Sequence, residues 1–96
     1  FSIMKKHIIT IYFCTKCGWL MRATWLSQEF INTFGSDISS VNLVPDSNGK
    51  FEIKCSNTLI FSRKKEGKFI DLKLMKQRLR DVINPSMSLG HSDTKF

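Results

Sequence analysis

The sequence lacks any long hydrophobic run: no stretch of its 96 residues approaches the roughly 18 apolar residues that a membrane-spanning helix needs. It also has few cysteines, and their number, three, does not fit the even sets of a disulfide-stapled secreted domain. A secretory signal peptide is not expected, because Lys5 and Lys6 precede a short strand-like run without a small-residue cleavage site. These absences predict a cytoplasmic protein with no membrane partner.

Acidic residues are also scarce. Eight Asp and Glu stand against fifteen Lys and Arg, which gives a net charge of +7. A basic chain attracts anionic partners, and the charges cluster at Arg63–Lys65 and along residues 73–80. No nucleic-acid recognition motif accompanies them, so nucleic-acid binding is a weaker interpretation than a mostly solvated surface.

The chain length predicts a single domain spanning residues 1–96. Met4, followed by two lysines, is the expected natural start, so residues 1–3 are interpreted as an added extension. Residues 86–96 are polar and contain Gly and Ser, which predicts a flexible tail.

Hydrophobic periodicity predicts the first two elements. Residues 7–13 are β-branched and aromatic on both faces, which is typical of a central strand covered on both sides. The pattern then becomes helical after Thr15, and Gly35 is expected to end this helix in a left-handed conformation. The apolar stripe of the helix consists of Trp19, Ala23, Leu26, Phe30 and Phe34.

The rest of the chain predicts three more strands and a second helix. Residues 39–44 form a short strand, 45–49 a loop, 51–62 an antiparallel hairpin and 63–68 a charged loop. A helix with apolar positions Leu72, Met75, Leu79 and Val82 stops before Pro85. The order β-α-β-β-β-α predicts a mixed α+β sheet of thioredoxin-like architecture, with one helix on each face.

The cysteine pair lies where the first strand meets the first helix. We expect Cys14 just before the helix and Cys17 in its first turn, where unpaired N–H groups and the helix dipole stabilise a thiolate. Lys16 and Arg22 add positive potential. A spacing of three brings the two sulfurs within bonding range, so the pair can carry out thiol–disulfide exchange.

Two other interpretations of the pair stay open. Both cysteines could be buried packing residues. Alternatively they could bind zinc, but four ligands are needed and the remaining candidates, Cys55, His7 and His91, form no second spaced pair. Cys55 alternates with apolar residues and is expected to face the core. No metal site or cofactor is therefore predicted.

Three residues beside the pair are candidates for substrate binding. Trp19 could offer an apolar platform near the sulfurs, although it could equally be a half-buried core aromatic. Gly18 could keep the first turn open for close approach or could equally be needed for packing, and Lys16 contributes positive charge.

The sequence resembles the selenoprotein W-related (SelT/SelW/SelH, Rdx) proteins of bacteria over roughly residues 6–93. The matching segments are Tyr12–Cys17, Trp19-Leu20, Arg22-Ala23, Trp25, Gln28-Glu29, Thr33–Gly35, Gly49–Ile53, Arg63-Lys64, Gly67, Phe69, Leu74, Lys76–Arg78, Arg80-Asp81 and Leu89–His91. The resemblance implies a thioredoxin-like fold and a redox role that involves glutathione. From the cysteine pair itself, an oxidised protein is the other expected partner.

The resemblance leaves the order of attack open. Selenocysteine-containing relatives carry selenocysteine at the position of Cys17, so this chain resembles the all-cysteine form and no selenium is expected. In thioredoxins, the first cysteine of the pair is the exposed attacking thiolate. This comparison points to Cys14, which we favour, whereas the position of selenocysteine in the relatives points to Cys17. Pro45 is not expected to replace the cis-proline that faces the cysteines of thioredoxins.

The sequence therefore predicts a thiol–disulfide redox protein whose Cys14 and Cys17 cycle between dithiol and disulfide. The alternative is a non-catalytic interaction module in which the redox state of the pair changes the surface that a partner meets.

Overall fold

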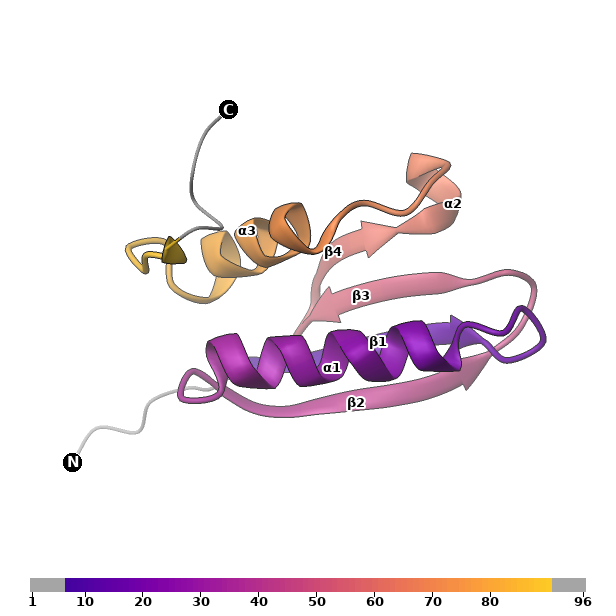
Figure 1. The fold of residues 1–96 in the computed structure, drawn as a ribbon, viewed down its shortest axis with the longest axis horizontal. Coiled ribbons are helices and arrows are strands. Elements are labelled where there is room, and N and C mark those ends of the chain that lie inside the picture. The colour runs from indigo at the N-terminus through magenta and orange to yellow at the C-terminus, as the bar shows by residue number, and fades with distance from the viewer. Residues whose placement is uncertain (1–6, 91–96) are drawn as a thin grey trace.

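A computed structural model describes residues 7–90, which form a four-stranded sheet and three helices (Figure 1). The elements are β1 (His7–Cys14), α1 (Leu20–Phe34), β2 (Ile38–Asp46), β3 (Phe51–Cys55), β4 (Thr58–Ser62), α2 (Arg63–Glu66) and α3 (Leu72–Ile83). The predicted order is confirmed, with α2 as an additional short helix inside the predicted charged loop. Within these residues, no helix is long and apolar enough to span a bilayer.

The strand order is β2-β1-β3-β4, so β1 is central. It pairs parallel with β2 and antiparallel with β3, and β3 and β4 form the predicted antiparallel hairpin. Because β1 and β2 run in the same direction, Cys14 and Asp46 lie opposite one another at their carboxyl ends. The loops that follow these two strands therefore meet at one end of the sheet.

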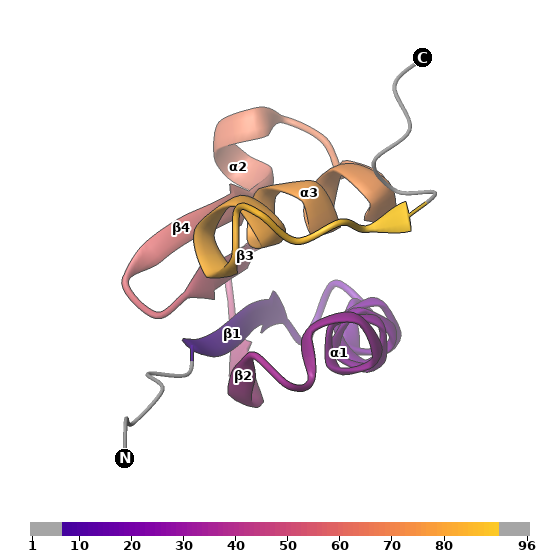
Figure 2. The ribbon, with the colours of Figure 1, turned by 90° about the vertical axis from the view of Figure 1, so that its left-hand side faces the viewer.

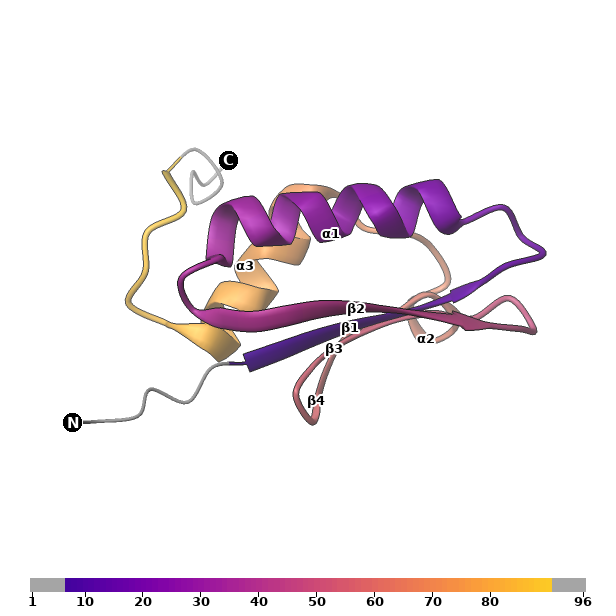
Figure 3. The same cartoon turned by 90° about the horizontal axis from the view of Figure 1, so that it is seen from below.

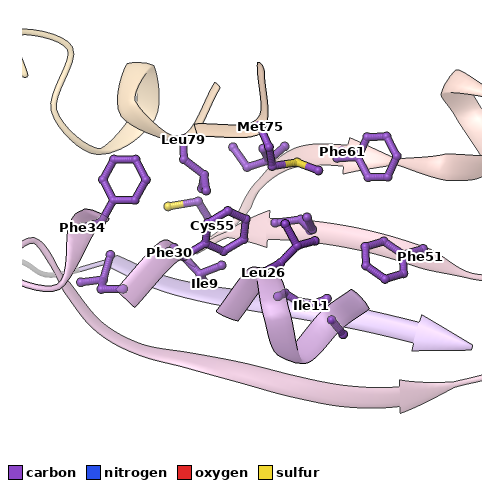
Figure 4. Packing of buried hydrophobic residues seen from close by; sticks show 14 of the residues in the cluster. Ile9, Ile11, Leu26, Phe30, Phe34, Phe51, Cys55, Phe61, Met75 and Leu79 are labelled. Carbon is purple, nitrogen blue, oxygen red and sulfur yellow. The ribbon is translucent and has the colours of Figure 1, made fainter. Parts of the chain in front are cut away.

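The prediction of one helix on each face of the sheet is wrong, because α1 and α3 both cover the same face (Figures 2 and 3). An ion pair joins the two helices, with Lys76 Nζ of α3 3.0 Å from Glu29 Oε1 of α1. Both helices contribute to one hydrophobic core against the sheet. Its fully buried large side chains include Phe30 and Phe34 of α1, Met75 and Leu79 of α3, and Ile9, Ile11 and Phe51 of the sheet (Figure 4).

The prediction that β1 is covered on both sides is wrong, because only one face of the strand is buried. Alternate residues of β1, Ile9 and Ile11, are fully buried, whereas Ile8 on the opposite face is 42% exposed. Tyr12 also lies on this open face, with Lys50 Nζ 4.9 Å from its ring centre. A β-branched or aromatic residue satisfies strand propensity on either face, so the apolar character of residues 7–13 did not reveal that only one face is covered.

The prediction of a left-handed Gly35 is also wrong, since its φ is −52°. Glycine is required there for another reason: a Cβ atom would lie 2.6 Å from the Ile31 carbonyl oxygen. In contrast, Gly67 ends α2 with a φ of 77°, and the Ser62 hydroxyl accepts a hydrogen bond from the Lys65 N–H at its start. These two caps explain why a charged segment of four residues is helical.

The segment after α3 packs against the core as far as the structure describes it. The side chains of Met87 and Leu89 contact the hydrophobic core, and Arg80 Nη1 donates to the Met87 carbonyl at 3.1 Å. Residues 1–6 and 91–96, including His91 and the predicted extension 1–3, lie outside the described residues. The flexible tail and the single-domain organisation stay predictions.

Candidate functional site

The two cysteines are held by different kinds of structure. Cys14 is the last residue of β1, and Cys17 lies in the turn of residues 15–18 that joins β1 to α1. Gly18 has a left-handed φ of 74°, and its N–H donates to the Thr15 carbonyl at 3.3 Å. The prediction that Cys17 lies in the first helical turn is therefore wrong, because this turn delays the start of α1 to Leu20.

The expectation that Cys14 is the exposed sulfur is also wrong. Cys14 is 3% exposed, whereas Cys17 is exposed. Cys14 is covered because the β2–β3 loop closes over the end of β1, where the Cys14 N–H donates to the Lys50 carbonyl at 2.8 Å. A substrate approaching from solvent thus meets the sulfur of Cys17 first.

The β2–β3 loop supplies a part of the site that the sequence analysis missed. The backbone N–H of Gly49 forms hydrogen bonds that stabilise the thiolates of both Cys14 and Cys17. Asn48 and Gly49 both adopt left-handed conformations, with φ values of 60° and 70°. Pro45 lies in β2 opposite Phe13, away from the position that Gly49 occupies, and residues 7–90 contain no cis peptide bond.

A hydrogen bond between the two thiols shifts their pKa values in opposite directions. The pKa of Cys14 is lowered, chiefly because the Cys17 thiol donates a hydrogen bond to it, with further hydrogen bonds from the backbone at Gly49, Cys17 and Lys16. The pKa of Cys17 is raised, chiefly by this same hydrogen bond. The thiolate of Cys14 is therefore stabilised by the partner thiol and by backbone N–H groups of the loops. From the sequence, this stabilisation was expected from the dipole of α1 instead.

The three predicted substrate-binding residues lie beside the pair. Lys16 and Gly18 are exposed in the same turn as Cys17. Trp19 is half-buried and packs edge-on against Phe51 and Phe69, with ring centres 5.9 Å and 5.2 Å away. Its packing supports the core interpretation of Trp19, while its position two residues after Cys17 keeps it at the site.

An apolar surface begins directly after the cysteine turn. Leu20, Met21 and Trp25, in the first two turns of α1, are 54%, 84% and 45% exposed. Large exposed side chains grouped in this way are typical of a surface that contacts another molecule.

The third cysteine takes no part in this site. Cys55 is fully buried in the core, as expected, and burial raises the pKa of its thiol. Among residues 7–90, no group of three or more His, Cys, Asp and Glu side chains is arranged to hold a metal ion.

The Rdx family model matches residues 8–81, which include the cysteine pair and, except for His7, all four strands. The chain belongs to the Rdx family. It is similar to a selenoprotein W-related protein of Vibrio cholerae, with 48% identity and a TM-score of 0.80 over 83% of this chain and 100% of that one. It is also similar to a protein of Bordetella parapertussis, with 41% identity and a TM-score of 0.78 over 81% and 99% of the two chains.

The family and these structural relatives confirm both the resemblance and the fold class. The chain has a mixed α+β, thioredoxin-like fold like that of selenoprotein W-related proteins. The family is generally associated with redox chemistry, which agrees with the close spacing of Cys14 and Cys17. No curated protein matches the chain significantly.

The geometry predicts selective modification of one thiol. At neutral pH, iodoacetamide should alkylate Cys17 at least ~10-fold faster than Cys14 or Cys55, because the other two thiols are buried. In Cys14→Ser, the pH at which Cys17 becomes reactive should fall, since the neighbouring thiolate that raises its pKa is gone. Mass spectrometry of proteolytic fragments after timed alkylation measures both effects.

Cys55→Ser serves as the control for this measurement and should leave the pH profile of Cys17 unchanged. A profile that also stays unchanged in Cys14→Ser would contradict the hydrogen bond by which Cys14 raises the pKa of Cys17.

Proposed function

We propose that this protein is a thiol–disulfide redox protein in which Cys17 attacks a substrate disulfide and Cys14 resolves the mixed disulfide. The observation that carries the proposal is the hydrogen-bonded pair of unequal exposure: Cys17 faces solvent, and Cys14 lies behind it at the end of β1. An exposed sulfur can reach a substrate, and a buried neighbour can react only with what the first sulfur has captured.

The first step uses the single proton of the pair. As the Cys17 sulfur attacks one sulfur of the substrate disulfide, its proton passes to the Cys14 thiolate. The substrate S–S bond breaks, one half leaves as a thiolate, and the other half becomes joined to Cys17. Cys14 thus acts as the base for its neighbour, which offsets the raised pKa of Cys17.

The second step releases the rest of the substrate. Cys14 loses its proton to the departed thiolate, assisted by the backbone N–H groups that stabilise its charged form. It then attacks Cys17, so the Cys14–Cys17 bridge forms and the second half of the substrate leaves as a thiolate. The substrate gains two electrons and the pair loses two, and a thiol donor such as glutathione restores the dithiol.

We propose an oxidised protein or a glutathione-linked species as the partner and a reducing compartment, the cytoplasm, as the location. The support is indirect: a free cysteine pair serves reductive exchange only where a thiol pool keeps it reduced. In this proposal, the exchange requires no metal or other cofactor. The net charge of +7 attracts anionic substrates to the protein.

A second candidate function is favoured by the apolar surface of Leu20, Met21 and Trp25. In this alternative, a partner protein binds the surface, and the redox state of the pair alters the adjoining turn without turnover. Measured turnover separates the two functions.

The proposed function is tested by equilibration in mixtures of reduced and oxidised dithiothreitol. We expect one two-electron transition in which Cys14 and Cys17 form an internal bridge, as in other Cys-X-X-Cys proteins. Mass spectrometry after acid quenching and alkylation measures the bridged fraction. The same protein should accelerate the reduction of insulin by dithiothreitol.

The matched controls are the three single Cys→Ser variants. Cys55→Ser should keep both the bridge and the turnover, whereas Cys14→Ser and Cys17→Ser should lose the bridge. Absence of an internal bridge in the parent protein would end the proposal, and a bridge without turnover would favour the interaction module.

A further inference from the structure

Two arginine side chains lie over the rings of Trp19 and Phe69, the aromatic pair that begins two residues after Cys17. The guanidinium carbon of Arg63, the first residue of α2, lies 5.1 Å from the ring centre of Trp19 and 5.2 Å from that of Phe69. The guanidinium carbon of Arg22, from α1, lies 4.0 Å from the ring centre of Phe69. Elements distant in the sequence thus bring two cations to the ring of Phe69.

Neither arginine is neutralised within the described part of the chain. Other cations have carboxylate partners there, such as Arg78 with Glu66 and Lys76 with Glu29. In residues 7–90, no carboxylate pairs with Arg22 or Arg63, and the buried Nε of Arg63 has no hydrogen-bond partner. Both positive charges therefore remain for an anion from outside this part of the chain.

This arrangement leaves donors available for a ligand. A guanidinium over an aromatic ring is attracted to the ring by its charge, and its N–H groups that have no acceptor in the protein can bind a carboxylate or phosphate. The aromatic rings also limit the side-chain rotamers, so less entropy is lost when an anion binds.

Arg63 is close enough to act on the attacking sulfur. The hydrogen bond with Cys14 raises the pKa of Cys17, and the charge of Arg63 opposes this rise. The turn that carries Cys17 and α2, which carries Arg63, also lie at the same end of the molecule (Figure 1). An anion bound at Arg63 would therefore lie near the point of attack.

We propose that Arg63 and Arg22 form an anion-binding subsite beside Cys17, which takes a carboxylate or similar anionic group that the substrate carries close to its disulfide. This inference rests on the proposed function and adds the class of substrate. The subsite selects disulfides with an anionic flank over neutral ones, and its residues position the substrate without taking part in the exchange.

The test compares two small disulfides of different charge, the dianion dithiobis(nitrobenzoate) and the neutral dithiodipyridine. For each protein, the second-order rate of reaction at Cys17 is measured spectroscopically with both reagents, and the ratio of the two rates is compared. Because both rates come from one sample, changes in folded fraction or in the pKa of Cys17 largely cancel in the ratio.

Arg63→Gln should lower the ratio of anionic to neutral rate about tenfold, as expected for loss of a charge-assisted contact, and Arg22→Gln should lower it less. Arg63→Lys should restore part of it. Lys65→Gln removes the same charge from an exposed position in α2 and should change the ratio less than about twofold, as rim charges do.

A ratio unchanged in Arg63→Gln, or lowered equally in Lys65→Gln, would overturn the subsite while leaving the exchange at Cys17 intact. If neither reagent reacts at Cys17 in the parent protein, the proposed function fails, and the subsite with it. The two failures are therefore distinguishable.

A pair of activated peptides identifies the source of the anion. Two pyridyl-disulfide peptides that differ only in Glu or Gln beside the cysteine are compared in the same way. Faster reaction of the Glu peptide extends the substrate class to acidic protein disulfides, while a preference confined to the small dianion restricts it to small molecules.

Discussion

Cys17→Ser is expected to abolish the formation of mixed disulfides with a substrate, lowering the rate by at least ~100-fold because a serine hydroxyl does not ionise near neutral pH and is a poor nucleophile toward sulfur. The two remaining thiols cannot substitute for it, since Cys14 is 3% exposed and Cys55 is fully buried. Cys14→Ser is expected to have the opposite effect: the exposed sulfur still attacks, but the mixed disulfide then accumulates.

The measurement uses a peptide disulfide under non-reducing conditions, with intact-mass spectrometry after acid quenching. The parent protein should pass through the adduct quickly, Cys14→Ser should hold it, and Cys17→Ser should not form it. Cys55→Ser is the matched control and should behave like the parent. An adduct that forms on Cys14 in the Cys17→Ser variant at the parent rate would reverse the assigned order of attack.

Phe30→Ala is expected to cost about 3–5 kcal/mol of the free energy of unfolding, as is usual when a large core aromatic is truncated. Phe30 is fully buried on the face of α1 that meets the sheet and α3 (Figure 4). Domains of this size are stable by only about 5–15 kcal/mol, so the variant should unfold at much lower urea concentration. Urea titration followed by circular dichroism measures the change.

Its neighbour provides the control. Ile31 is 51% exposed on the same helix, so Ile31→Ala should change the stability by no more than about 0.5 kcal/mol. Equal losses in the two variants would show that α1 does not pack through the face described here.

The elements of the fold followed from the sequence, whereas their layering did not. The stripe of Ala23, Leu26, Phe30 and Phe34 correctly predicts which face of α1 is buried, because helical periodicity reports the side that avoids water. It does not say which face of the sheet the helix meets. That choice depends on the connections between elements and on contacts such as Lys76 with Glu29, which join residues far apart in the chain.

The candidate site was predicted in the same incomplete way. Spacing alone identifies the pair of Cys14 and Cys17, but the residues that tune it, Gly49 and Arg63, come from other elements. One signal for Gly49 was available in the predicted β-α-β order. A helix that joins two strands favours parallel pairing, the carboxyl ends of parallel strands lie at one edge of the sheet, and Gly49 follows the second of these strands. Arg63 had no such signal, since it stood in a run of three basic residues.

The two cysteines lie in segments of different rigidity, and this difference determines which segment moves when the disulfide forms. Cys14 belongs to the central strand, which is paired with neighbours on both sides, whereas Cys17 belongs to a short turn outside the sheet ladder. The backbone hydrogen bonds of this turn, from Gly18 to the Thr15 carbonyl and from Thr15 to the Asp46 carbonyl, are both 3.3 Å long. Closing and opening the bridge should therefore move the turn and leave the strand in place. Each oxidation would then change the conformation at the start of α1, where a bound partner would contact it, while the hydrophobic core keeps its packing.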